Sequence, residues 1–372
     1  MANKAFGIIT SAGGNFHVEG LHDYRPIGAF SFLGRYRVID FPISNMSNSG
    51  IDQIQVYVSS RPRSIAEHIG TGRHYNINSK RGKIQLLFTQ INNPMSVYNN
   101  NIAGFIENME IIERMHLPYV VIAPSYMIYK QDYSKILDEH VESGADVTLL
   151  YHKVSDARDA YIGCSVLNLN KQKGVLSITP NMGTAKEKNI FMDTYVMSKE
   201  IFMDLVQQAR AQSSAYTLSD IVSAKCEELD VRGVSHRGTF ASITSLNDYY
   251  NANLSLLDLD KANDLFRSNW PIYTRTTNAC PTQYFDTADV KKSMIANGCL
   301  IEGKVENSII GRDVHIRKGA VVRDSIVLAY SDIGEGVKID KTVVDKWAKI
   351  TNGNEIKGTL DHPGYVKRND KI

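Results

Sequence analysis

A six-residue apolar period in the C-terminal part of the chain constrains the fold more than any other feature. Aliphatic residues recur at this spacing in two series, Ile310, Ile316, Val322 and Leu328, and then Val327, Ile333 and Ile339. The period fits neither an α-helix nor an ordinary strand, and it is typical of a β-helix built from hexapeptide turns. Glycines such as Gly298, Gly311 and Gly319 supply the corners that these turns need. We therefore predict a left-handed parallel β-helix over residues 289–372.

The N-terminal part of the chain has the pattern of an α/β domain. A short apolar segment, residues 5–9, leads into Gly13 and Gly14. An apolar strand followed by a glycine turn is how many α/β folds present backbone N–H groups to phosphate, although most glycine pairs are ordinary turns. Residues 118–122 have the composition of a strand buried in a parallel sheet. The loop after this strand lies where open α/β sheets place their ligands.

Length and helix-breaking pairs predict two domains. The chain has 372 residues, which is too long for one small core. Residues 259–288 contain a Trp-Pro and a Cys-Pro pair and few periodic runs, so we place an inter-domain linker there. The sequence thus predicts an α/β domain over residues 1–258 and the β-helix over residues 289–372.

Composition argues against several classes of function. Lys and Arg number 42 and Asp and Glu 40, so bulk charge favours neither nucleic acid nor membrane as a partner. No run of 18 apolar residues occurs that could span a bilayer, and the apolar N-terminus lacks a signal-peptide cleavage site. The four cysteines are scattered without a C-x-x-C motif. We therefore expect reduced thiols and a cytoplasmic location.

Four stretches of the sequence resemble the bacterial ADP-glucose pyrophosphorylases, or glucose-1-phosphate adenylyltransferases. They are GRYRVIDFPISNMSNSGI at 34–51, IYKQDYSKIL at 128–137, NWPIYTRT at 269–276 and the hexapeptide repeats, in the order that the family shows. Members of this family join ATP and glucose 1-phosphate into ADP-glucose for glycogen synthesis. The resemblance implies a Rossmann-like nucleotidyltransferase domain with a mixed sheet, followed by a left-handed β-helix.

The phosphate-binding part of the family pattern is altered in this chain. In the family, the loop that begins with the glycine pair continues to another glycine and then an arginine. Phe16 and Val18 stand at those places, followed by Glu19, and Ile27 replaces a lysine in the basic segment. A bulky ring blocks close approach of the backbone to phosphate, and a carboxylate repels it.

The metal-binding and sugar-binding positions are altered as well. By resemblance, Tyr126 stands in place of one metal-binding aspartate and Ser242 in place of the other, and Thr179 replaces the lysine that holds the sugar phosphate. Mg²⁺ prefers carboxylate ligands, and a transferring phosphoryl group needs cationic partners. We therefore expect no intact catalytic residue, no metal ligand and no Mg-ATP site.

Three arginines of the basic segment remain. Arg25, Arg35 and Arg37 lie where the family binds anionic metabolite effectors, although a solvated basic face would have the same composition. We assign them as effector-binding residues by resemblance. Guanidinium groups suit this role because they hold phosphate through two parallel hydrogen bonds.

The sequence favours a regulatory, catalytically degenerate subunit of glucose-1-phosphate adenylyltransferase. Such a chain is expected to assemble with an active sister subunit, as a hetero-oligomer and by expectation a tetramer. A weakly active adenylyltransferase is one alternative, with neighbouring acids such as Asp132, Asp193 and Asp248 as substitute ligands. A purely structural partner is another. A hexapeptide-repeat acyltransferase is a remote third, for which His315 is the only histidine between 289 and 361 that could act as a base.

Overall fold

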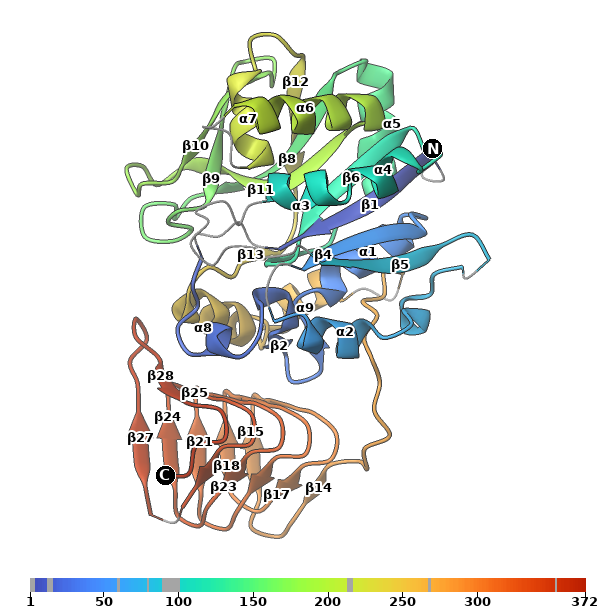
Figure 1. Ribbon diagram of the computed structural model, residues 1–372. Coiled ribbons are helices and arrows are strands. Elements are labelled where there is room, and N and C mark those ends of the chain that lie inside the picture. The colour runs from blue at the N-terminus through green and yellow to red at the C-terminus, as the bar shows by residue number, and fades with distance from the viewer. Residues whose placement is uncertain are drawn as a thin grey trace. The chain divides into compact units, whose positions relative to one another are not determined.

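The structure is a computed structural model that describes residues 4–11, 16–58, 61–78, 80–88, 101–212, 217–266, 269–351 and 353–372 (Figure 1). The chain divides into two compact units. Unit 1 consists of Met1–Phe16, Ile39–Phe240 and Asn269–Tyr273, and unit 2 of His17–Val38, Ala241–Ser268 and Thr274–Ile372. Residues 17–38 and 241–268 therefore group with the C-terminal repeats, although the sequence pattern assigned them to the first domain and to the linker.

Unit 1 is built on a nine-stranded sheet. Its longest path runs β10-β9-β11-β6-β1-β4-β5, with β8 paired to both β11 and β12. The strands are β1 (Ala5–Thr10), β4 (Gln53–Val58), β5 (Lys83–Phe88), β6 (Tyr119–Pro124), β8 (Val147–Val154), β9 (Ser165–Leu169), β10 (Val175–Pro180), β11 (Lys188–Ser198) and β12 (Val231–His236). The β1, β4, β5 and β6 neighbours are parallel, whereas β11 is antiparallel to β6, β8 and β9. The predicted mixed sheet is confirmed.

Helices cover this sheet and bury a continuous core. They are α1 (Asp40–Asn48), α2 (Arg63–Ile69), α3 (Asn101–Glu107), α4 (Met109–Glu113), α5 (Tyr133–Ser143), α6 (Lys199–Ala211) and α7 (Leu218–Ala224), with the 3-10 turn η4 (Arg73–Tyr75) and the short strand β7 (Met127–Tyr129). In Figure 1, α3, α6 and α7 lie over the face of the sheet turned to the viewer. Phe105 and Phe202 from these helices pack with sheet residues such as Ile122 in one buried cluster.

The C-terminal part of unit 2 is a β-helix. Its faces are three five-stranded sheets, and all of their strand pairs are parallel. One face contains β14 (Gln283–Tyr284), β17 (Leu300–Ile301), β20 (His315–Ile316), β23 (Asp332–Ile333) and β26 (Lys349–Ile350). The second contains β15 (Asp289–Lys291), β18 (Lys304–Glu306), β21 (Val321–Arg323), β24 (Lys338–Asp340) and β27 (Glu355–Lys357). The third contains β16 (Met294–Ile295), β19 (Ile309–Ile310), β22 (Ile326–Val327), β25 (Thr342–Val344) and β28 (Gly364–Val366). This architecture confirms the fold predicted from the six-residue period.

The remaining elements of unit 2 come from earlier in the chain. They are η2 (Leu21–Asp23), η3 (Ile27–Ala29), β2 (Ser31–Phe32), β3 (Tyr36–Arg37), α8 (Leu246–Ser255) and α9 (Leu259–Leu265), and β13 (Phe240–Ser242) precedes α8 at the unit boundary. Helix α8 connects the N-terminal segment to the coil. The Tyr249 hydroxyl donates to the carbonyl of Ser31, and the Tyr250 hydroxyl donates to the carbonyl of Asp324, each at 2.5 Å.

Candidate functional site

The predicted site residues are divided between the two units. Phe16, Tyr126 and Thr179 belong to unit 1, and the other degenerate positions belong to unit 2. Gly13 and Gly14, the predicted remnant of the nucleotide loop, lie outside the described residues.

Tyr126 lies at the carboxyl ends of two central strands. Strands β1 and β6 run in parallel with Thr10 opposite Pro124, and the Ser125 N–H donates to the carbonyl of Thr10 at 2.9 Å. This edge of a parallel sheet is where α/β folds bind ligands. The Tyr126 side chain is buried, and the Phe16 ring lies 5.4 Å from its own ring, centroid to centroid. Two aromatic side chains therefore stand at the edge that the resemblance assigned to phosphate and metal.

Asp193 is the partner of the Tyr126 hydroxyl. It sits in a bulge of β11, between Phe191 and Thr194, with φ of 43°, and its Oδ2 accepts a hydrogen bond from Tyr126. Burial raises the pKa of the Asp193 carboxyl to about 6. Burial, and next the charge of Asp193, raise the pKa of Tyr126 well above its ordinary value, so the phenol keeps its proton and acts as the donor.

The pairing of Tyr126 with Asp193 does not fit a Mg²⁺ site. Mg²⁺ needs several oxygen acceptors in a near-octahedral arrangement, and it usually keeps water ligands. Here a protonated phenol stands beside one half-buried carboxyl whose pKa is raised, and an aromatic ring packs against the phenol. Asp193, which the sequence offered as a substitute ligand, is thus bonded to the residue that replaced the predicted aspartate.

Thr179 cannot supply the charge of the lysine that it replaces. It lies near the exposed end of β10, where its hydroxyl accepts a hydrogen bond from Asn168 on β9 at 3.1 Å. A hydroxyl on a strand can bond a sugar phosphate but cannot neutralise it. The resemblance places a lysine of the family at this position, and Thr179 lacks the positive charge of a lysine.

In unit 2, the degenerate positions are part of the core. Val18 is fully buried, Ile27 is 2% exposed and Ser242 is 5% exposed. Val18 and Ile27 lie beside η2 and within η3, respectively, in the segment that packs with the β-helix. Apolar side chains at these positions contribute to packing, where the family pattern has an arginine and a lysine.

Arg25 is bound in a buried ion pair. Its Nη2 donates to both carboxylate oxygens of Asp345, at 2.6 and 2.5 Å, and both side chains are buried. The Tyr365 hydroxyl and the Lys346 backbone N–H also donate to this carboxylate, at 2.9 and 2.7 Å. Asp345 therefore neutralises the charge of Arg25, one of the three predicted effector arginines, within unit 2.

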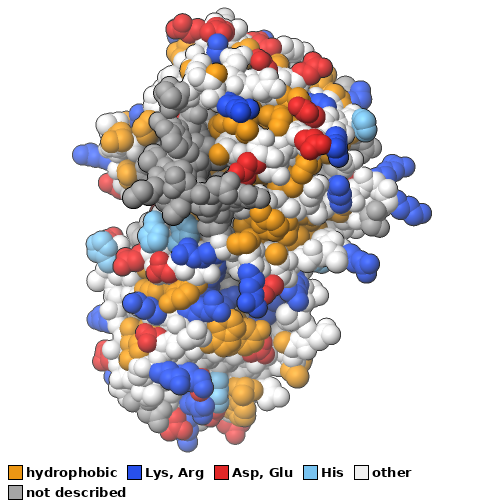
Figure 2. Space-filling view, viewed as in Figure 1, with side chains coloured by type: hydrophobic (Ala, Val, Ile, Leu, Met, Phe, Trp, Pro, Cys, Tyr) orange, Lys and Arg blue, Asp and Glu red, His pale blue; other side chains and the backbone are white. Residues whose placement is uncertain are grey.

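Further cations surround this pair. Burial, and after it the positive charges of Arg37 and Arg25, lower the pKa of Lys346 to about 7. Arg368 lies 4.6 Å above the Trp347 ring and also repels the Lys346 ammonium. We call Arg25, Arg37, Lys346 and Arg368, with Asp345, the basic cluster. Four basic side chains around one carboxylate favour an added anion, and Figure 2 shows several Lys and Arg side chains gathered over unit 2.

Sequence reasoning missed two members of the basic cluster. Lys346 and Arg368 lie in the repeats, more than 300 positions after Arg37 in sequence order, and nothing in their spacing points to the basic segment. Only the grouping of residues 17–38 with the coil brings them together.

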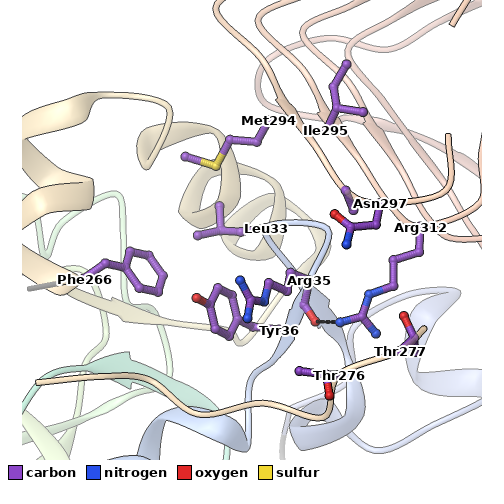
Figure 3. Close-up of a pocket in the computed structure, with 11 residues that line it drawn as sticks. Leu33, Arg35, Tyr36, Phe266, Thr276, Thr277, Met294, Ile295, Asn297 and Arg312 are labelled. Carbon is purple, nitrogen blue, oxygen red and sulfur yellow. Dashed lines mark hydrogen bonds between the residues drawn. The ribbon is translucent and has the colours of Figure 1, made fainter. Parts of the chain in front are cut away.

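Arg35 lies apart from the basic cluster. It lines a cavity of about 440 Å³ that Leu33, Tyr36 and Phe266 also line (Figure 3). The structure therefore separates the three predicted arginines into two settings, because Arg25 and Arg37 belong to the basic cluster and Arg35 lines the cavity.

Within the described ranges, no group of three or more His, Cys, Asp or Glu side chains is arranged to hold a metal ion. In the same residues, no helix is both long enough and apolar enough to cross a membrane. All four cysteines are free thiols.

Comparison with known proteins places this architecture in a family. Residues 7–258 match the family described as nucleotidyl transferase, and residues 281–362 match the GlmU-like, C-terminal hexapeptide family. The chain belongs to the nucleotidyl transferase family. The relatives of this nucleotidyl transferase chain fall into two groups by name.

A glucose-1-phosphate adenylyltransferase of Clostridium perfringens (strain 13 / Type A) is 29% identical over 339 residues, which are 88% of this chain and 86% of the relative. The glycogen biosynthesis protein GlgD of Geobacillus stearothermophilus is 32% identical over 328 residues, 87% of this chain and 84% of the relative. GlgD of Bacillus subtilis (strain 168) is 27% identical over 368 residues, 98% of this chain and 96% of the relative.

Proposed function

We propose that this nucleotidyl transferase chain is a regulatory subunit of glucose-1-phosphate adenylyltransferase in glycogen biosynthesis, with no catalytic activity of its own. Its similarity to proteins named glucose-1-phosphate adenylyltransferase and GlgD supports the reaction and the pathway. The main observation in favour of lost activity is the hydrogen bond from the Tyr126 hydroxyl to Asp193, because it replaces a ligand for a cation by a hydrogen bond within the chain.

The reaction displaces pyrophosphate from the α-phosphorus of ATP. It requires neutralisation of the triphosphate and in-line placement of the sugar-phosphate oxygen. At the carboxyl edge of β1 and β6, this chain presents a phenol and the ring of Phe16 instead of carboxylates. Loss of one such group typically costs a hundredfold or more in rate, that is, roughly 3 kcal/mol, so the combined loss leaves almost no activity.

Regulation is proposed to act through a shared interface with the active subunit. A chain that keeps the family architecture can stabilise the competent conformation of its partner by a coupling free energy of roughly 1–3 kcal/mol. The basic cluster is the proposed place for an anionic effector. Arg37, Lys346 and Arg368 are its main cations, because Arg25 is engaged by Asp345.

A weakly active enzyme is the main alternative. It would need Asp193 as a ligand, and that half-buried carboxyl is bonded to Tyr126 and has a raised pKa. The acyltransferase alternative has one observation in its favour, since His315 Nε2 lies 2.7 Å from Glu302 Oε1, and a carboxylate can orient a histidine base. We expect no acetyl transfer from acetyl-CoA, and His315→Gln should not alter the behaviour of a mixed enzyme.

The test is an assay of the purified chain alone and then mixed with the active subunit from the same cell. We expect no ADP-glucose above background from the chain alone, co-purification with the active subunit, and a raised activity or an altered effector response of the mixture. Tyr126→Asp and Ser242→Asp should not restore activity, because one carboxylate without its partner and the phosphate clamp leaves the charge unneutralised. Chelator-sensitive turnover by the unmodified chain would contradict the proposal.

A further inference from the structure

Two histidine rings face each other in the sheet of unit 1. Strands β8 and β12 are parallel, and His152 lies opposite His236 at the last pair of their ladder. The two Nδ1 atoms are 3.0 Å apart, which is a hydrogen-bond distance. His152 is half-buried, whereas His236 is only 4% exposed. Neither ring belongs to the predicted catalytic positions or to the basic cluster.

A neighbouring carbonyl determines which ring is the donor. His236 Nε2 lies 3.1 Å from the backbone oxygen of Lys130, and a carbonyl oxygen can only accept a hydrogen bond. His236 Nε2 therefore carries a hydrogen, and Nδ1 of the same neutral ring is an acceptor. The hydrogen between the two rings must then come from His152 Nδ1. The neutral pair is thus one chain of hydrogen bonds, from His152 through His236 to Lys130.

Apolar groups pack around the pair. Ile190 on β11 lies opposite His152, and the Phe240 ring lies 5.0 Å from the His152 ring, centroid to centroid. Tyr161 in turn stacks on Phe240, with centroids 5.6 Å apart and an interplanar angle of 16°. Placing a charge in such surroundings costs free energy, so the uncharged rings are favoured.

The neighbouring titratable groups do not reverse this preference. Burial lowers the pKa of His152, and the contact with His236 and the charge of Asp156 offset this shift only in part. Tyr129 packs against the His236 ring at 5.7 Å between centroids. Burial raises the pKa of Tyr129 to about 12, so its phenol stays neutral beside the pair.

The pair can keep its hydrogen bond with one added proton but not with two. The first proton belongs on Nε2 of His152, because that ring is the more exposed and is attracted by Asp156. His152 Nδ1 still donates to His236 in this state. A second proton has to occupy Nδ1 of His236, and two N–H groups of like charge then point at each other. Two charged rings must therefore separate.

The bond to Lys130 connects the pair to a tryptophan. The carbonyl of Tyr129, the preceding residue, accepts a hydrogen bond from Asn45 Nδ2 at 3.0 Å. Asn45 Oδ1 accepts a hydrogen bond from Trp270 Nε1, also at 3.0 Å. The short segment at 129–130 is thus held by His236 and by Asn45, and a change at the first contact can reach Trp270 through the second.

We propose that His152 and His236 form a proton-operated switch, in which uptake of a second proton breaks their bond and loosens the attachment of Lys130. Trp270 reports this change through Asn45. In the unfolded chain both histidines become charged below about pH 6.5, whereas the folded pair resists the second proton. The free energy of unfolding of unit 1 should therefore decrease as the pH falls below that value. The proposal does not depend on the regulatory role, because every measurement is made on the isolated chain.

The first test reads the tautomers by NMR of the full chain labelled with nitrogen-15 at histidine. Near neutral pH we expect the Nε2–H tautomer for His236 and the Nδ1–H tautomer for His152, with signals assigned from His152→Asn and His236→Gln. On acidification His152 should become charged first, and the second proton should follow at a lower pH. An Nε2–H tautomer for neutral His152, or charging of both rings in one step, would overturn the proposal.

The second test measures quenching of Trp270 emission by acrylamide in the Trp347→Phe background. In this parent chain quenching should rise about twofold between about pH 7.5 and about pH 5, as expected for a local opening. His236→Gln can still donate to Lys130 but takes up no proton, so its quenching should not change with pH. His236→Phe loses both hydrogen bonds, and at about pH 7.5 it should be quenched as strongly as the parent chain is at about pH 5.

Two further variants serve as controls. His116→Gln, which changes an exposed histidine elsewhere in unit 1, should respond to pH as the parent chain does. Asn45→Leu should remove the response of Trp270 and leave the ring titrations unchanged, and a response that persists would exclude transmission through Asn45. A pH response that persists in His236→Gln would belong to another group, such as Asp193, and would contradict the switch.

Discussion

Arg25 and Asp345 are 320 positions apart in the chain, and the guanidinium of the first donates hydrogen bonds of 2.6 and 2.5 Å to the carboxylate of the second. The arginine is 4% exposed and the aspartate is fully buried. Tyr365 donates to the same carboxylate, and Gly20 lies against the Tyr365 ring so closely that a Cβ would overlap it. The N-terminal segment is therefore an integral part of unit 2 and not a free basic loop.

Breaking this pair should destabilise unit 2 selectively. Arg25→Ala leaves the Asp345 carboxylate buried without its cation, and such changes typically cost about 3–5 kcal/mol. The chain has two tryptophans, Trp270 in unit 1 and Trp347 in unit 2. Urea unfolding followed by Trp347 fluorescence in a Trp270→Phe background therefore reports on unit 2.

The matched control uses Trp270 fluorescence in a Trp347→Phe background, where Arg25→Ala should shift the transition much less. The double change Arg25→Leu with Asp345→Leu should recover most of the lost stability, because it removes both buried charges. A loss below about 1 kcal/mol in the Trp347 signal would contradict a structural role for the pair.

Asp193 should make unit 1 less stable as the pH rises from about 4 to about 6. Burial raises the pKa of its carboxyl from 3.8 to about 6 in the folded chain. In this window the folded chain keeps a proton that the unfolded chain has released, so the free energy of unfolding falls with pH. Above about pH 6 both states are ionised, and the accumulated loss is constant at about 3 kcal/mol.

The comparison that isolates this effect is with Asp193→Asn. Asparagine tolerates positive φ and can still accept the Tyr126 hydrogen bond, so the variant should be more stable at pH 7.5 by roughly 1–3 kcal/mol. Its advantage should vanish near pH 4. Asp204→Asn, which changes an exposed carboxylate on α6, should show no such dependence. Parallel curves for the wild type and Asp193→Asn, measured by Trp270 fluorescence, would disprove the effect.

The β-helix was predictable because its register follows the sequence period. In the structure, the inward positions Ile310, Ile316, Val322, Val327, Ile333 and Ile339 succeed one another around the coil and contribute to one buried cluster. The two series of the sequence are thus one series with a single five-residue step. Val327, and not Leu328, pairs with Ile310 on the third face, so the first series departs from the register at its last member.

The candidate site was only partly predictable. Position by position, the resemblance predicted that Tyr126 stands in place of an aspartate, and it left Asp193 among the possible substitute ligands. Nothing in the sequence around either residue indicates that they are in contact. The contact depends on a bulge in β11 that gives the backbone of Asp193 a positive φ. Arg25 is a similar case, since its partner lies in a repeat that the period marks only as apolar. Contacts across long sequence separations come from topology and leave no local pattern.

A chain that ends near Asp258 should be poorly soluble or lose its oligomeric assembly. The truncation removes the coil, including Asp345 and the Asp324 carbonyl that bind Arg25 and Tyr250, so Arg25 and buried apolar side chains of unit 2 become exposed. Size-exclusion chromatography and binding of a hydrophobic dye measure the two outcomes. Full-length Arg25→Ala is the useful comparison, because it loses the ion pair but keeps the coil. A truncated chain that is monodisperse and assembles as the full chain does would contradict the prediction.

Binding of an anion at the basic cluster should be accompanied by uptake of a proton. Burial and the neighbouring arginines lower the pKa of Lys346 to about 7, so a large part of its amine is neutral above that pH. An anion that binds beside it favours the charged form and raises the pKa, and the site then takes up a proton between about pH 7 and 9. Affinity should accordingly fall as the pH rises through this window, since the neutral amine must first be protonated.

Sulfate is a suitable probe because its own charge does not change in this range. Titration calorimetry in two buffers of different ionisation enthalpy should give different heats, and the difference measures the protons taken up. Lys346→Met should abolish the difference and weaken sulfate binding about tenfold, whereas Lys318→Ala, which removes an exposed cation elsewhere on the coil, should leave both unchanged. Equal heats in the two buffers for the wild-type chain would show that Lys346 does not respond to the anion.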